Sequence, residues 1–160
     1  MRRLSKKSIA VMLEACLAYA HFLAVLTQVV FLSSEAALCR AEWLGEVVVR
    51  RLGRLDRIHA VAAAAVLATG LARVYLGSKG SAWYWGNPLL HLKFTLFLVM
   101  VLLSVGSSRA FLRWRRALDA GDGLPAPEEV RRVRRIVMWQ AHLLPLIPLA
   151  AVFMARGFGR

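Results

Sequence analysis

The sequence predicts an all-α fold: a polytopic membrane protein built as a bundle of four transmembrane helices. Two observations predict it. Hydrophobic residues make up 59% of the 160 residues and the mean hydropathy is +0.55, whereas a soluble domain contains about 45–50% apolar residues. The ionisable residues also cluster between long apolar runs. This pattern excludes a disordered tail and a soluble enzyme. The two cysteines, Cys16 and Cys39, form no metal or redox motif and exclude a disulfide scaffold.

Four apolar stretches are long enough to cross a bilayer as helices, because a span takes about 20 residues and the backbone must satisfy its own hydrogen bonds in lipid. Asn87 followed by Pro88 marks the start of the third span, with a capping side chain and a proline at the first helical position. Pro145 and Pro148 predict a kink in the fourth span. Residues 1–160 are therefore expected to form a single transmembrane domain. The expected spans cover about residues 8–32, 58–76, 88–106 and 136–155.

Residues 1–11 form a basic extension ahead of the first span. Basic residues followed by an apolar run also occur in signal peptides, but this run is too long for that and lacks a cleavage site. We therefore expect a retained helix. Met12 is an alternative start of the protein, so either Met1 or Met12 begins the chain.

The distribution of basic residues indicates the orientation in the membrane. The connections after the first and third spans hold 13 Lys and Arg residues, against eight around the second connection and at the two termini. The positive-inside rule places the two basic connections in the cytoplasm and both termini outside. The cations of residues 1–11 oppose this orientation unless the chain starts at Met12, and the opposite orientation is the alternative. The net charge of +13 is explained by loops facing anionic lipid, so no nucleic-acid partner is expected.

Ionisable residues inside a span are costly, so each one invites a functional interpretation. At a rise of 1.5 Å per residue, most of them fall in the outer third of the bilayer. His21 lies about 10 Å deeper than Glu14, near the membrane centre. His59 is expected at the cytoplasmic mouth of the second span. The residues inside the spans are Glu14, His21, Arg73, His91, Lys93 and His142.

His21 is the strongest candidate for binding a cofactor, because it has no charged neighbour within a helical turn. A neutral imidazole is a good axial ligand for haem iron. Haem propionates need cations near the polar edge, and Arg73 and Lys93 could supply them. His91 is a candidate second ligand or proton relay, although it lies about 9 Å shallower than His21. The motif for covalent haem attachment is absent, so the expected cofactor is haem b, with His21 as the metal ligand.

Each of these residues also has a simpler interpretation. Arg73 and Lys93 are long enough to reach the membrane interface without binding anything. Glu14 lies at the headgroups if Met12 is the first residue. His142 lies near the inner surface, and we expect its ring to bond to a backbone carbonyl.

Several motifs resemble an uncharacterised family of small bacterial four-helix membrane proteins. The resemblance covers essentially Met12 to Gly159 and implies the fold and a place in the bacterial inner membrane. The family has no established activity. The motifs include Arg54-Leu-Asp-Arg57, Leu67-Ala-Thr-Gly-Leu-Ala-Arg73, Gly77-Ser-Lys-Gly-Ser-Ala-Trp-Tyr-Trp-Gly-Asn-Pro88 and His91-Leu-Lys93.

More distantly, the layout is similar to the HemJ-type protoporphyrinogen oxidase. That enzyme is a four-helix haem protein of the membrane, with a histidine in helix one and a His-x-Lys pair in helix three. His21, His91 and Lys93 match those positions. This resemblance implies haem binding and a porphyrin-related role for the three residues.

Three functions therefore stay open. The first is a b-haem-binding membrane protein with a redox or porphyrin-related role. The second is a non-catalytic structural or accessory subunit that docks on a membrane-protein partner or on a second copy, and small residues such as Gly70 favour close helix contacts. The third is a small transporter, which the absence of an internal repeat disfavours.

Overall fold

The computed structural model describes residues 2–77 and 80–159, with side chains from Ser8 onward, and every regular element in these ranges is helical. Four helical stretches in them are long and apolar enough to cross a membrane, the fourth being α5 continued by α6. This confirms the predicted fold class. The helices are α1 (Arg2–Leu38), η1 (Ala41–Trp43), α2 (Glu46–Leu76), α3 (Ser81–Trp85), α4 (Pro88–Ala120), α5 (Pro127–Leu143) and α6 (Leu146–Ala155).

The helices continue beyond the expected spans at the ends joined by the first and third connections. α2 begins at Glu46, well before residue 58, and α4 continues to Ala120, well past residue 106. These additional turns carry arginines on one face and fully buried apolar side chains such as Leu52 and Trp114 on the other. They were missed because an amphipathic turn is less apolar than a lipid-facing turn, although it packs just as well.

The helix boundaries near the other end follow the predicted signals. The Asn87 side chain accepts a hydrogen bond from the backbone N–H of Leu89 at 2.9 Å, and Pro88 occupies the first turn of α4. The fourth span is interrupted between Leu143 and Leu146, where Pro145 separates α5 from α6. Both the predicted cap and the predicted break are confirmed.

Two separate clusters of buried side chains hold the bundle together. The larger one lies where the basic connections join the helices, and it includes Leu52 of α2, Trp114 of α4 and Val137 of α5. The smaller one joins α2, α4 and α6 at the opposite end through Val74, Leu90 and Met154. The chain is thus packed most extensively at its arginine-rich end.

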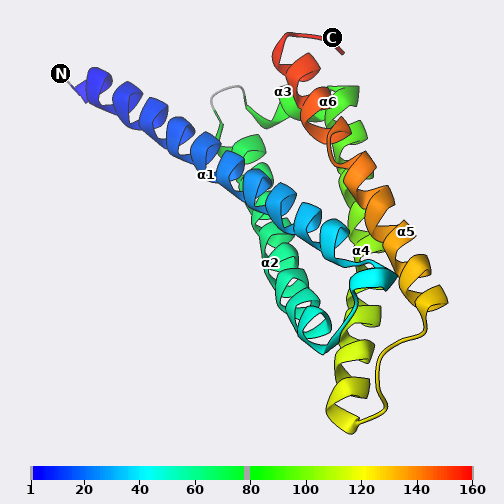
Figure 1. Cartoon of the computed structure of the whole chain (residues 1–160). Helices are drawn as coiled ribbons and strands as arrows, with labels where there is room; N and C mark the ends of the chain where they lie inside the picture. The colour runs from blue at the N-terminus through cyan, green and yellow to red at the C-terminus, as the bar shows by residue number, and fades with distance from the viewer. Residues whose placement is uncertain (1, 78–79, 160) are drawn as a thin grey trace.

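α1 leaves the bundle toward its N-terminus, as Figure 1 shows by the separation of its first turns from the other helices. Large apolar side chains there are exposed, including Val11 at 62%, Tyr19 at 69% and Phe22 at 59%, as expected of a helix that contacts lipid. The helix runs through residues 2–11 without a break, so its backbone does not separate the proposed extension from the span. Lys79 and Arg160, which contributed to the charge bias, lie outside the described residues.

Candidate functional site

His21 of α1 faces α2 at the level of Thr69 and Gly70. Its Nδ1 lies 2.9 Å from the hydroxyl oxygen of Thr69, and its ring packs over Gly70, where an added Cβ would lie 3.4 Å from His21 Cε1. The Thr69 hydroxyl donates its one proton to the Ala65 carbonyl, at 2.6 Å. Thr69 is therefore placed to accept from Nδ1–H of His21, an arrangement that would leave the lone pair of the ring on Nε2.

Two cations from other helices accompany this imidazole. Arg73 of α2 and Lys93 of α4 are half-buried, and both act electrostatically on the His21 ring. The two cations also act on each other. Three of the four predicted site residues are thus brought together by three different helices, and they combine one imidazole with two basic side chains.

His91 does not join this group. Its side chain is exposed, and its Nε2 donates a hydrogen bond to the backbone carbonyl of Trp85, 3.0 Å away. The ring also lies beside the Trp85 indole, with 6.0 Å between ring centroids. This contact fixes the turn between α3 and α4 and directs His91 away from the neighbourhood of His21.

Elsewhere, His142 Nδ1 lies 2.6 Å from the Met138 carbonyl, which confirms its expected bond to the backbone. Glu14 is half-buried on α1. Within residues 2–77 and 80–159, no three His, Cys, Asp or Glu side chains are grouped so that they could hold a metal ion. A metal at His21 would therefore need further ligands from a cofactor such as a porphyrin.

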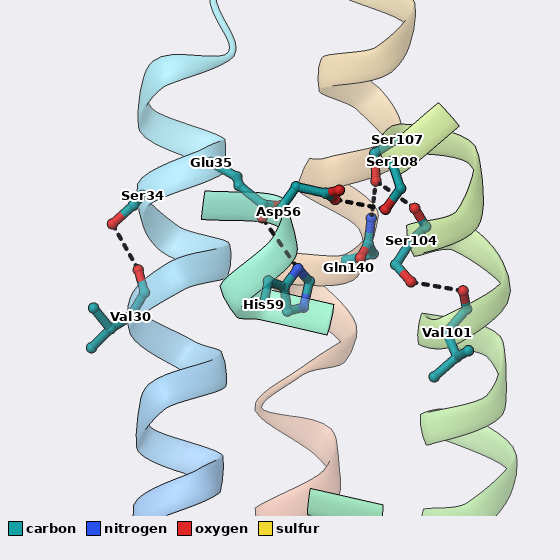
Figure 2. A network of polar contacts seen from close by, with 10 residues as sticks. All are labelled: Val30, Ser34, Glu35, Asp56, His59, Val101, Ser104, Ser107, Ser108 and Gln140. Atoms are coloured by element: carbon teal, nitrogen blue, oxygen red, sulfur yellow. Dashed lines mark hydrogen bonds and ion pairs between the residues drawn. The ribbon is translucent and has the colours of Figure 1, made fainter. Parts of the chain in front are cut away.

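A second polar group, which was not predicted, forms a layer across all four spans near the basic connections (Figure 2). Glu35 of α1 is fully buried, and its Oε1 lies 3.3 Å from Nδ1 of His59 on α2, which is 3% exposed. That separation is within ion-pair distance, although neither Glu35 oxygen accepts a hydrogen bond from the described residues.

The remaining members extend this layer toward α4 and α5. Ser108 donates a hydrogen bond of 2.6 Å to the Asp56 carboxylate. The Gln140 side chain, fully buried on α5, points its Nε2 at the Ser107 hydroxyl at a long 3.4 Å. The Gln140 oxygen finds no partner in the part of the chain that the structure describes. The layer is therefore only partly satisfied, which is costly in a buried environment.

This inner polar layer could have been found from helical spacing. Gln28, Leu32 and Glu35 of α1 recur every three or four residues and are all buried, and Cys39, directly after the helix, continues the same spacing. Glu35 lies beyond residue 32, where the first span was expected to end, and His59 was expected at the mouth of the second span. Both instead lie on helix faces whose buried residues are mostly apolar. A polar residue in register with such a face is a signal of a buried polar contact.

Residues 13–159 match a family described as a predicted membrane protein, DUF2214, and the chain belongs to this family. The predicted resemblance to an uncharacterised membrane family is thereby confirmed. The curated proteins and the solved structures gave no match.

Proposed function

We propose that this member of the DUF2214 family binds b-type haem in the outer half of its bundle, with His21 as the axial ligand. One observation carries the proposal: the Thr69 hydroxyl, which donates to the Ala65 carbonyl, lies 2.9 Å from Nδ1 of His21 and is placed to accept from Nδ1–H. A histidine that ligates iron commonly donates its other ring N–H to an acceptor, which fixes the tautomer and leaves Nε2 for the metal. The contact with Thr69 favours this tautomer of His21.

The charges beside His21 support the same proposal. Arg73 and Lys93 belong to different helices and both act on the imidazole, so two cations are available to two propionates. Bound haem would supply reversible one-electron chemistry. The chain itself would hold the imidazole neutral, orient the propionates and keep water from the apolar ring. We assign the ligand role to His21 alone, because His91 is bonded to the Trp85 carbonyl.

Titration of haem into the detergent-solubilised protein tests this assignment. Arg73→Gln and Lys93→Gln should each weaken haem binding by about tenfold or more, since a hydrogen bond to a charged group contributes about 1.5–3 kcal/mol. Arg109→Gln removes one exposed cation from α4 outside the proposed site and should leave the affinity unchanged. Equal haem affinity in all three variants would show that Arg73 and Lys93 do not bind the propionates.

A second candidate function is a non-catalytic subunit of a larger membrane complex. It is supported by α1, whose N-terminal turns separate from the other helices and expose Tyr19 and Phe22 (Figure 1). The partner would be another membrane protein or a second copy of the chain. Cross-linking from position 19 in native membranes tests this candidate, because adducts to lipid alone would count against it.

We further propose that the protein lies in a bacterial inner membrane with both termini in the periplasm. The four candidate spans establish a multi-pass arrangement, and the basic connections favour this orientation by the positive-inside rule. In that orientation the His21 site lies toward the periplasm and the inner polar layer lies toward the cytoplasm.

A further inference from the structure

An arginine-lined cavity of about 770 Å³ lies between η1 and the first turns of α5, far along the chain from the His21 site. We propose that it binds the headgroup of an anionic phospholipid, with preference for a headgroup that carries two phosphates. The inference is independent of the proposed haem site. It rests on the charge of the cavity walls, on cations there without partners, and on the position of the cavity relative to the membrane.

The charge of the walls is strongly positive. Five arginines line the cavity, against the two carboxylates Glu42 and Glu128. Three positive charges therefore remain uncompensated, which suits a ligand with more than one negative charge. The five are Arg40, Arg131, Arg132, Arg134 and Arg135.

Two of these arginines are occupied within the protein. Arg131 pairs with Glu128 at 2.6 Å. Arg134 donates to the Ala36 and Cys39 carbonyls, each at 3.3 Å, and thereby ties α5 to the C-terminal end of α1. These contacts shape the cavity. The other three arginines that line it are free to bind a ligand.

The other three arginines are available. Arg132 and Arg135 form no hydrogen bond or ion pair with the described parts of the chain, although Arg132 acts electrostatically on Glu129. The Arg40 guanidinium stacks 4.6 Å from the centroid of the Trp43 ring, while its Nε is buried without an acceptor. A phosphate oxygen in the cavity would accept charge-assisted hydrogen bonds from the planar guanidinium groups that line it.

The position of the cavity identifies the source of the phosphate. Residues 131–135 immediately precede the expected fourth span at 136, so at 1.5 Å per residue they lie within about 8 Å of the hydrocarbon. That is the depth of the headgroup layer. Trp43, at the same end, exposes 57% of its surface, and tryptophan is enriched at membrane interfaces. Lipid phosphates are concentrated at this depth, and basic pockets beside spans are suited to them.

Native mass spectrometry of the detergent-solubilised full chain tests the inference, with cardiolipin, phosphatidylglycerol and phosphatidylcholine as probes. We expect retention in that order, with cardiolipin bound about tenfold or more tightly than phosphatidylglycerol. The variant Arg132→Gln/Arg135→Gln should lose that preference. The control Arg109→Gln/Arg116→Gln removes the same charge from exposed positions on α4 outside the cavity and should retain it.

Three results would overturn the inference. Equal loss in both double variants would mean that lipid is held by general surface charge. Equal retention of cardiolipin and phosphatidylglycerol would remove the two-phosphate preference. Displacement of bound lipid by millimolar inorganic phosphate would identify the ligand as soluble phosphate and not a lipid.

Discussion

Glu35 and His59 show most clearly how burying individual ionisable side chains costs free energy in this protein. Each is almost completely removed from solvent, and their closest atoms are 3.3 Å apart. Placing an ionisable pair inside a bundle is expensive, and apolar residues of similar volume often stabilise a fold equally well. The pair therefore stabilises the bundle only while both partners are present.

The first prediction concerns this pair. His59→Leu leaves a buried carboxyl group without a partner and should cost about 3–5 kcal/mol. Glu35→Leu leaves only an imidazole N–H unsatisfied and should cost about 1–3 kcal/mol. The double variant should recover most of the loss. Thermal denaturation in detergent measures the three values.

The control for this cycle is the Arg50–Asp119 ion pair, which is 2.6 Å long but 47% exposed on both sides. Arg50→Gln should cost less than about 1 kcal/mol, as exposed pairs do. If the stability losses of the two single Leu variants summed to the loss of the double variant, Glu35 and His59 would not interact as described.

Cys39 gives a prediction about pH. Burial raises the pKa of its thiol to about 11, with Arg134 opposing the shift and Glu35 adding to it. The folded state therefore holds the thiol proton more tightly than the unfolded state. This contribution to stability is complete below the ordinary value of 9.0 and is lost as the pH rises toward 11.

Alkylation in detergent measures this directly, because the thiolate is the reactive form. Cys16 is exposed and Cys39 is fully buried. We expect one thiol to react with maleimide in the folded protein between pH 7 and 9, and both to react after denaturation. Prompt modification of both thiols at pH 7 would contradict the packing around Cys39.

At the scale of elements, Asn87 links the start of α4 to the turn that follows α6. Its Oδ1 caps α4 through Leu89 N–H, and its Nδ2 donates to the Phe158 carbonyl at 3.1 Å, beyond the end of α6. Gly159 approaches so closely that an added Cβ would lie 2.7 Å from the Asn87 Oδ1, at a φ of 86° that favours glycine. The residue thus fastens the C-terminal turn to the start of α4.

Asn87→Ala should lower the stability by about 1–2 kcal/mol through loss of the cap and should also free the C-terminal turn. Asn87→Asp keeps the capping oxygen but removes the amide donor. It should therefore retain the stability of α4 while hydrogen exchange around Phe158 still accelerates. Slow exchange there in both variants would show that the turn is held by other contacts.

The helices were predictable where their surroundings are lipid, and less so where they pack on one another. Apolar length located all four spans, Asn87 located the start of α4, and Pro145 located the break in the fourth span. The turns from Glu46 to residue 58 were not predicted, because there a buried stripe that includes Leu52 alternates with arginines. Mean apolarity measures exposure to lipid, whereas these turns are stabilised by a narrow packed face.

The sequence indicated which residues of the candidate site share a level along the helices, but not which way their side chains point. The rise per residue placed Arg73, His91 and Lys93 at one level. Only Lys93 and Arg73 come near His21, because two residues along a helix correspond to a rotation of about 200°, which points His91 elsewhere. Glu35 meets its partner on another helix. Predicting that contact would have required the rotation of each helix about its own axis.

At the scale of the whole molecule, the orientation in the membrane decides which side each site faces. Ser81 lies between the second and third spans, and Asp122 lies between the third and fourth, and both side chains are exposed. We expect Ser81→Cys to react with an impermeant maleimide in intact spheroplasts. Asp122→Cys should react only after lysis. The reverse pattern would invert the orientation and place the His21 site toward the cytoplasm.

The most direct test of the haem proposal is the absorption spectrum of protein purified from haem-replete cells. We predict a Soret band that shifts on reduction, is abolished in His21→Ala and persists in His91→Ala, because His21 lies beside Arg73 and Lys93 whereas His91 is bonded to the Trp85 carbonyl. A colourless wild-type preparation, or a Soret band that survives in His21→Ala, would contradict the account and leave the accessory-subunit function as the better proposal.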